Sequence, residues 1–367
     1  MGKAIIYPGF ISAELEELLQ TICEKKDKDE VHIAPFNRFG NSGSNLYLIF
    51  FSKDKSSVPH LLKTNSDKVK AENEVKAMKI LEEKYSYTEC EPFFTDKLHG
   101  ILLEYHFDDK HNEFKKTPKT IKNIIFEDKG NEICKHIEKA LEGFRNVYKP
   151  SDQENCFIKD CYKKYLRGNE TKEIIKELTK DNIDSEKIDF FGQEITNPVY
   201  IMENMIEKTT ITKSLIHGDL HTDNIVINHE NCPRIVDFAW STENDIYIDF
   251  ALLEVSARYW GTPFFLNSAS KKELEDRTLK EPIDIENIGN FDIRVQRMMS
   301  LANQIRQCCK DIVGKNFKFE RYLLSQFIIL YGLQKFTDNY NPFIVIPFLG
   351  RLGDQLKEYK YVKERSP

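Results

Sequence analysis

Residues 214–241 constrain the fold more than any other part of this 367-residue chain. Two short runs, IVI at 225–227 and RIV at 234–236, flank a turn that contains Asn231 and Pro233. Strand-forming runs around such a turn predict a β-hairpin. Gly218 lies before the hairpin and interrupts any helical pattern, so we expect residues 217–224 to form a loop.

Polar side chains lie at the ends of these runs. Asp219 is in the loop, Asn224 directly precedes the first run and Asp237 directly follows the second. The hairpin would bring Asn224 and Asp237 close together, and their oxygen atoms suit Mg²⁺. A separate carboxylate on the loop suits a base that accepts or orients a hydroxyl proton. Phosphoryl transfer needs this division of roles, because its catalysis is mostly positioning and charge neutralisation.

The motifs HGDLHTDN (217–224) and VDF (236–238) resemble those of the protein-kinase-like small-molecule phosphotransferases, such as aminoglycoside phosphotransferases, choline kinases and methylthioribose kinase. Gly218 stands where protein kinases usually carry arginine, which favours the small-molecule branch. The resemblance implies that Asp219 is the catalytic base and that Asn224 and Asp237 are metal ligands. Ala239 replaces the glycine of the usual D-F-G, a departure that is common in this branch.

A narrower resemblance involves VDFAWS and the following IDFALLE. Together they resemble the ternary-complex-associated branch of the superfamily, phosphotransferase-like proteins linked to bacterial conflict systems. Within IDFALLE, Asp249 resembles the structural aspartate that braces the catalytic loop by hydrogen bonds.

The same resemblance implies nucleotide-binding residues further upstream. Lys63 falls where a strand lysine would contact the α- and β-phosphates, and its partner would be Glu72 or Glu74 on the next helix. Glu74 is preferred, since NEVKAM best matches the start of the family's helix. A lone strand lysine or a glutamate on a charged helix is usually solvent-facing, so only the downstream motif gives these residues a function.

Two further segments complete the predicted ATP site. LLEYH resembles a kinase hinge, where the Glu104 carbonyl and the His106 amide would meet the adenine edge. The turn GNSGSN departs from G-x-G-x-x-G, and alone it would more often be an ordinary hairpin turn. The residues that we expect to cover the phosphates there are Gly40, Ser42, Gly43 and Ser44.

The resemblance implies an α+β, bilobal protein-kinase-like fold, with a small antiparallel sheet and one helix in the N-lobe and a larger helical C-lobe. Apolar spacing over 11–26 predicts a helix with Ser12 as its N-cap. We expect an N-terminal helical extension at 1–30, an N-lobe with the covering loop and hinge at 31–107, and a C-lobe with the catalytic and metal motifs at 108–367. Residues 108–213 and 248–340 are expected to be mostly helical.

Composition limits the partners. The net charge of −6 argues against a dedicated nucleic-acid binder, and the late apolar runs FIILYGL and NPFIVIPFLG are too short to span a bilayer. We therefore expect a small-molecule hydroxyl acceptor, ATP and Mg²⁺, with no nucleic acid and no membrane; protein partners stay open. The acidic Glu243, Asp245 and Glu254 would favour a cationic acceptor.

The cysteines and two histidines could form disulfides or a metal site. None of the eight cysteines forms a C-x-x-C pair, so all are expected to be reduced thiols in a cytoplasmic protein. His217 and His221 are four residues apart, as in a zinc pair on a helix, but Gly218 argues against a helix and no third ligand is evident. His217 is expected to be a buried residue that orients the loop.

Two classes of function remain open at this point. One is an active ATP-dependent kinase with an alcohol group as acceptor. The other is a nucleotide-binding regulatory or scaffold module, similar to a pseudokinase, in a bacterial multi-protein system. The presence of every catalytic position favours the enzyme.

Overall fold

The computed structural model describes residues 4–6, 11–36, 44–51, 60–85, 90–104, 119–125, 132–145, 148, 153–179, 183–227, 231–259, 268–286, 288–337 and 340–363. The chain forms two compact units. Unit 1 comprises residues 1–119 and 226–242, and unit 2 comprises residues 120–225 and 243–367. Unit 1 contains a largely antiparallel sheet with helices and unit 2 is mainly helical, so the predicted α+β class is confirmed.

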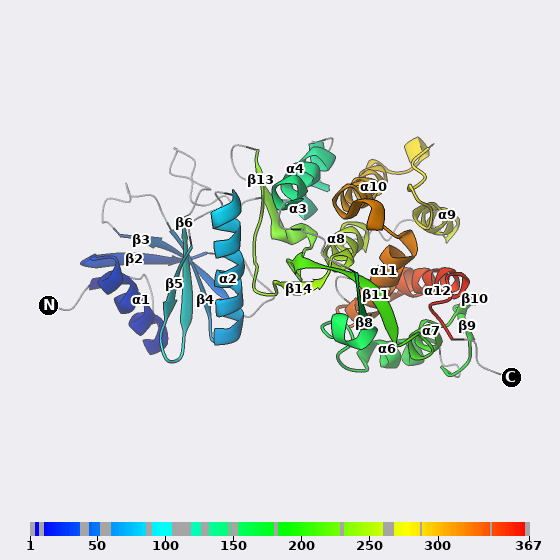
Figure 1. Ribbon diagram of the computed structural model, residues 1–367, viewed down its shortest axis with the longest axis horizontal. Coiled ribbons are helices and arrows are strands. Elements are labelled where there is room, and N and C mark those ends of the chain that lie inside the picture. The colour runs from blue at the N-terminus through cyan, green and yellow to red at the C-terminus, as the bar shows by residue number, and fades with distance from the viewer. Residues whose placement is uncertain are drawn as a thin grey trace. The chain divides into compact units, whose positions relative to one another are not determined.

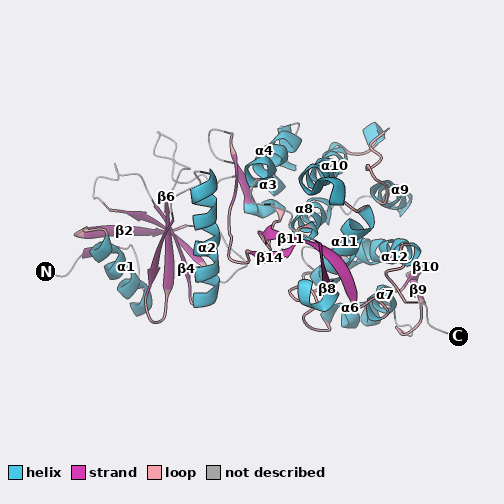
Figure 2. Cartoon of the chain, viewed as in Figure 1, coloured by secondary structure: helices cyan, strands magenta, loops and turns pink. Residues whose placement is uncertain are grey.

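Unit 1 is built on a six-stranded sheet in the order β1-β2-β3-β4-β6-β5 (Figures 1 and 2). Neighbouring strands are antiparallel, except that β1 runs parallel to β2. The strands are β1 (Ala4–Ile6), β2 (Glu30–Pro35), β3 (Asn45–Phe50), β4 (His60–Asn65), β5 (Cys90–Phe94) and β6 (His99–Glu104).

Two helices cover opposite faces of this sheet (Figure 1). In α1 (Ala13–Lys25), the apolar stripe packs in one core cluster with Leu62 of β4. Lys63 is the next residue along β4, so its side chain points to the other face, where it contacts α2 (Lys68–Tyr85). The predicted helix and its cap are confirmed, because Ser12 Oγ accepts the Leu15 N–H at 3.3 Å. The segment before residue 31 thus adds α1 and β1 to unit 1.

The predicted hairpin is also confirmed. Its strands, β12 (Ile225–Ile227) and β13 (Pro233–Ile235), are neighbours in a small sheet, and most of the hairpin groups with unit 1. Asp237 follows β13 with a φ of 70°, in the left-handed region. The short strand β7 (Lys119–Thr120) lies where the chain passes from unit 1 to unit 2.

Unit 2 surrounds helix α8 (Tyr247–Tyr259), all of whose residues are buried. Its charged residues Asp249, Glu254 and Arg258 are buried as well, and each of them makes hydrogen bonds. It packs against α10 and α11. The other helices are α3 (Ile121–Ile125), α4 (Ile133–Arg145), α5 (Ile158–Cys161), α6 (Glu170–Thr179), α7 (Pro198–Glu203), α9 (Ser268–Thr278), α10 (Ile293–Val313), α11 (Phe319–Leu333) and α12 (Pro342–Glu358), with short 3₁₀ turns η2 (Thr222–Asn224), η3 (Ile288–Asn290) and η4 (Gly314–Asn316).

The helical prediction holds for 248–340 in its described part but is wrong for much of 108–213. That region contains β8 (Gln153–Phe157), β9 (Lys187–Phe190), β10 (Gln193–Thr196) and β11 (Lys208–Ile216). β11 has the sequence KTTITKSLI, whose β-branched residues favour a strand despite its two lysines. It forms the centre of a sheet with the order β14-β11-β8, where β14 is Thr242–Asp245.

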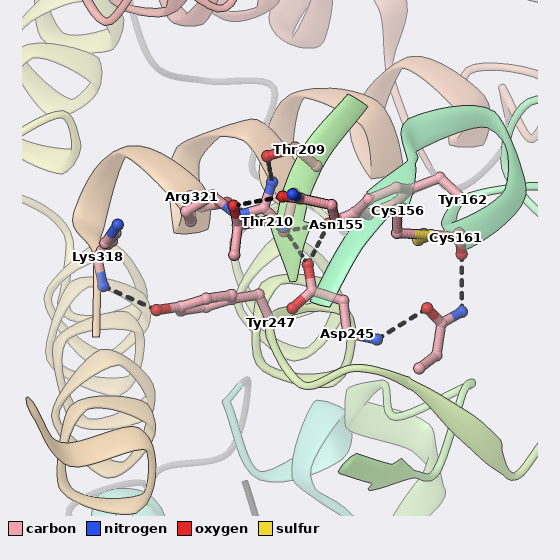
Figure 3. A network of polar contacts seen from close by, with 12 residues as sticks. Asn155, Cys156, Cys161, Tyr162, Thr209, Thr210, Asp245, Tyr247, Lys318 and Arg321 are labelled. Carbon is pink, nitrogen blue, oxygen red and sulfur yellow. Dashed lines mark hydrogen bonds and ion pairs between the residues drawn. A yellow bond between two sulfur atoms is a disulfide. The ribbon is translucent and has the colours of Figure 1, made fainter. Parts of the chain in front are cut away.

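The cysteine prediction is wrong for one pair. Cys156 near the end of β8 and Cys161 at the end of α5 form a disulfide (Figure 3). The chain turns directly from β8 into α5, and this turn brings together two cysteines only five residues apart. The other six cysteines are free thiols.

No helix in the described ranges combines the length and the apolar character that crossing a bilayer requires.

Candidate active site

Lys63 is at the centre of a buried ion-pair cluster in unit 1. The side chain is only 9 % exposed, and its Nζ donates to Glu74 Oε1 at 2.8 Å and to Asp237 Oδ1 at 2.6 Å. Burial alone would lower the pKa of Lys63, but the two nearby carboxylates outweigh burial and raise this pKa well above its usual value. Lys63 therefore stays cationic at neutral pH.

The two glutamates considered as partners of Lys63 lie in different surroundings. Glu74 is buried against Lys63, whereas Glu72 is exposed and lies 3.8 Å from Lys68 on the surface of α2. The cluster contains two carboxylates and one ammonium group, so it has one negative charge in excess when all three are ionised. Such an excess attracts a further cation.

In unit 2, β11 leads into the loop that carries Asp219. The Asp249 carboxylate, on the buried helix α8, accepts the His217 N–H at 2.6 Å and the Gly218 N–H at 2.8 Å. Tyr148 donates its hydroxyl to the same carboxylate at 2.7 Å. Gly218 has a φ of 75°, a conformation that glycine adopts at little cost. The prediction that Asp249 braces this loop is confirmed.

His217 and Asn224 hold the loop at two further points. His217 is fully buried, and its Nδ1 accepts the Asp219 N–H at 3.2 Å, so the predicted loop-orienting role is confirmed. Asn224 ends the turn η2, and its Nδ2 donates to the Asp219 carbonyl at 2.9 Å. Because the amide nitrogen is used in this way, Oδ1 is the atom of Asn224 that suits a cation.

The Asp219 carboxylate has a cationic partner that the sequence did not predict. Lys164 Nζ lies 2.5 Å from Asp219 Oδ1 and 2.9 Å from the Gly218 carbonyl oxygen. His221 Nε2 lies 3.8 Å from Asp219 Oδ2. Burial would raise the pKa of Asp219, but Lys164 and His221 outweigh burial and hold this pKa below its usual range. Asp219 is therefore a carboxylate at neutral pH.

Of the remaining predicted nucleotide-binding residues, only Ser44 and Glu104 lie within the described part of the chain. Ser44 is buried, and its Oγ accepts a hydrogen bond from Asn65 Nδ2 at 3.2 Å. Glu104 ends β6, where it is paired in register with His60 of β4. The other four predicted positions, Gly40, Ser42, Gly43 and His106, lie outside the described residues. The covering loop and the hinge thus stay predictions.

The acidic residues expected to favour a cationic acceptor do not form such a surface. Asp245 is fully buried, and its Oδ2 accepts from Arg321 Nη2 at 2.6 Å and from the Tyr162 hydroxyl at 3.1 Å (Figure 3). Glu254 is also fully buried and lies 2.7 Å from Arg306. The prediction is wrong for both, because buried arginines neutralise them. Glu243 is exposed and lies 3.5 Å from Lys213.

Across the described ranges, no three side chains of His, Cys, Asp or Glu come together in a group that could hold a metal ion. The ring of His217 instead accepts a hydrogen bond from the Asp219 N–H through Nδ1.

Comparison with known protein families gives a match to the segment that contains the 217–224 loop. Residues 201–274, which include β11, the loop, the hairpin and α8, match the model of the phosphotransferase enzyme family. Comparison with curated protein sequences gave no match.

Several solved structures are similar over most of the chain. An aminoglycoside-3'-phosphotransferase of type VIII shares 12 % identity, with 80 % of this chain and 100 % of that chain covered and a TM-score of 0.42. A thermostable mutant of aminoglycoside phosphotransferase APH(4)-Ia, bound to AMP-PNP and hygromycin B, shares 9 % identity. The alignment covers 95 % of this chain and 98 % of that chain, with a TM-score of 0.46. Choline kinase from Cryptosporidium parvum Iowa II shares 12 % identity. The alignment covers 94 % of this chain and 95 % of that chain, with a TM-score of 0.40. The family match falls on the segment that carries HGDLHTDN and VDF, the motifs in which the sequence resembles small-molecule phosphotransferases.

Proposed function

We propose that the protein is an ATP- and Mg²⁺-dependent kinase that transfers the γ-phosphoryl group to a hydroxyl group of a small molecule. The observation that carries the proposal is the buried Lys63, bound to both Glu74 and Asp237. Burying an ion pair such as Lys63–Glu74 is costly for folding, and buried pairs with perturbed pKa values concentrate at functional sites. We further propose that the protein acts in the cytoplasm, although disulfides such as Cys156–Cys161 are rare there.

Lys63 is proposed to bind the α- and β-phosphates, since an ammonium group binds phosphate oxygens as a point charge. Glu74 would hold Lys63 in place from α2. The backbone of Glu104 and His106 is proposed to bind the adenine edge. The covering loop is proposed to contribute Gly40, Ser42, Gly43 and Ser44.

Asp237 and Asn224 are proposed as the Mg²⁺ ligands. Both offer oxygen atoms, which Mg²⁺ prefers, and the Asn224 amide nitrogen is already bonded to the loop backbone. The negative charge in excess around Lys63 also suits a divalent cation. When bound, Mg²⁺ supplies charge neutralisation for the phosphate oxygens.

Asp219 is proposed to orient the acceptor hydroxyl. In the reaction, the hydroxyl oxygen forms a bond to the γ-phosphorus, and the bond from that phosphorus to the β–γ bridging oxygen breaks to release ADP. The hydroxyl proton passes to the Asp219 carboxylate and then to solvent. A carboxylate with a lowered pKa is a weak base, which suits a reaction that depends more on positioning than on early proton removal.

The experiment combines nucleotide binding with a metabolite screen. Calorimetry should show ATP binding that weakens without Mg²⁺, and a panel of hydroxylated metabolites should reveal ATP consumption that Asp219→Asn abolishes. Failure to bind nucleotide at millimolar concentration would overturn the kinase proposal. MgATP binding without turnover on any acceptor, unchanged in Asp219→Asn, would favour the regulatory or scaffold module instead.

A further inference from the structure

We propose that Lys164 is a further active-site residue, which orients the Asp219 carboxylate and supplies positive charge where the phosphoryl group reaches the acceptor. This inference rests on the proposed kinase function and extends it. Lys164 belongs to none of the motifs that relate the chain to its superfamily: it lies 55 residues before Asp219, in the sequence KKYLRG.

The contacts of Lys164 centre on the loop. Its Nζ donates both to Asp219 Oδ1 at 2.5 Å and to the Gly218 carbonyl at 2.9 Å, so one ammonium group bridges the carboxylate and the backbone just before it. The ammonium also lies 5.7 Å from the ring centre of Tyr165, which is buried. The side chains of Lys164 and Asp219 are 30 % and 25 % exposed, so a ligand has access to both.

The loop backbone does not depend on this ion pair for its conformation. Asp249 already accepts the N–H groups of His217 and Gly218, and Asn224 Nδ2 already donates to the Asp219 carbonyl. Ion pairs between solvent-exposed side chains contribute little to stability, typically about 0–1 kcal/mol, and this pair is partly exposed to solvent. The contact of Lys164 therefore acts mainly on the carboxylate of Asp219 and only slightly on the fold.

This contact determines which oxygen of Asp219 serves the acceptor. Oδ1 is engaged by Lys164, so Oδ2 is the oxygen on which a hydroxyl would be held. The phosphorus that this hydroxyl attacks is one bond beyond the hydroxyl oxygen, and its other oxygens carry the charge of the transition state. A fixed ammonium group beside Asp219 stabilises that charge.

The nearby histidine is a weaker source of charge. Burial lowers the pKa of His221, which makes its ring neutral near pH 7. Among the described residues, Lys164 also lies closer to the Asp219 carboxylate, at 2.5 Å against 3.8 Å for His221.

The test uses the full-length chain and three variants. Lys164→Met removes the charge, Lys164→Arg keeps it, and Lys163→Met is the matched control. The Lys163 side chain is exposed and makes no hydrogen bond or ion pair with the described residues. MgATP turnover is measured with the acceptor that the screen identifies or, without one, as hydrolysis with water as acceptor. Thermal melting of each variant reports folding.

Lys164→Met should lower kcat by roughly 10²–10³-fold, as for loss of one charge-stabilising donor, while KM for ATP and the melting temperature stay at wild-type values. Lys164→Arg should recover part of kcat, and Lys163→Met should match the wild type. If Lys164→Met keeps the wild-type kcat, or loses activity only in proportion to unfolding with no rescue by arginine, Lys164 is not an active-site residue. A wild-type protein that turns over no MgATP overturns the proposed function itself, and this inference with it.

Discussion

The ammonium group of Lys63 lies 2.6 Å from the carboxylate of Asp237, although 174 residues separate the two in the chain. Lys63 belongs to the central sheet of unit 1, and Asp237 follows the hairpin formed by β12 and β13. Folding of unit 1 therefore assembles a lysine and the metal-motif aspartate into one cluster, with Glu74 as its third member.

Glu74→Ala should destabilise the protein strongly. It removes one counterion of the buried Lys63 and opens a cavity, a change that typically costs about 3–5 kcal/mol. Glu72→Ala is the matched control on the same helix, and its exposed side chain predicts a change within about 0.5 kcal/mol. Urea denaturation measures both free energies of unfolding. Equal effects of the two variants would show that the Lys63–Glu74 pair contributes nothing specific.

Asp219→Asn and Asp237→Asn should have different effects on MgATP affinity and on turnover. Asp219→Asn should leave MgATP affinity nearly intact while turnover falls by roughly 10²–10⁴-fold, because only the acceptor hydroxyl loses its partner. Asp237→Asn should weaken metal-dependent nucleotide binding as well as turnover, because it removes a proposed Mg²⁺ ligand. Calorimetry and turnover assays on both variants decide the roles. If Asp219→Asn abolishes MgATP binding and Asp237→Asn does not, the two roles are reversed.

Asp249→Asn should loosen the loop that carries Asp219. The carboxylate accepts two backbone N–H groups, whereas an asparagine offers one acceptor oxygen and leaves one buried N–H without a partner. An unsatisfied buried donor costs about 1–3 kcal/mol. We expect lower stability in urea together with lower turnover, and faster hydrogen exchange at residues 217 and 218. Unchanged exchange at those amides would contradict the bracing role.

The pH dependence of stability should include a contribution from Asp292, the N-cap of α10. Its side chain bonds to the Arg294 guanidinium and N–H, and these contacts lower the pKa of Asp292 to about 2. A lowered pKa stabilises the fold above pH 4, where the carboxylate is ionised in both folded and unfolded states. This contribution is lost as the pH falls from about 4 to 2.

Asp292→Asn keeps a capping side chain but removes the charge, so it is the suitable comparison. The difference in unfolding free energy between wild type and variant should be constant from pH 7 to 5 and should shrink below pH 4. A difference that does not change with pH would show that the charge of Asp292 has no part in stability.

The sequence predicted those parts of the site that are close together along the chain. Asp219, Asn224 and Asp237 stand at fixed spacings around two short strands, and Asp249 follows in a second short motif. Lys63 and Glu74 could be chosen only because that motif required them. Lys164 could not be chosen, since nothing in KKYLRG distinguishes it from Lys163 before the chain folds.

The errors in the predicted fold have a related cause. The region before residue 213 is rich in lysine and glutamate, which favour helices, but β11 is the central strand between β8 and β14 and buries five of its nine residues. From the sequence, Asp245 and Glu254 were expected to lie on an acidic surface. In the structure, Asp245 pairs with the buried Arg321 and Glu254 pairs with the buried Arg306. The buried arginine partners leave no local signal in the sequence, whereas the β-branched residues of β11 are a local signal for a strand.

The left-handed backbone at Asp237 has a consequence for how such a chain changes over evolutionary time. A φ of 70° strains an aspartate less than most residues but more than glycine, by up to roughly 1–2 kcal/mol. Glycine would adopt this conformation without that cost, but it would also remove the carboxylate that lies 2.6 Å from the buried Lys63, so the gain in the backbone is offset by the loss of an ion pair. In a lineage that no longer needed a metal ligand, the pairing with Lys63 would therefore still favour a carboxylate at position 237.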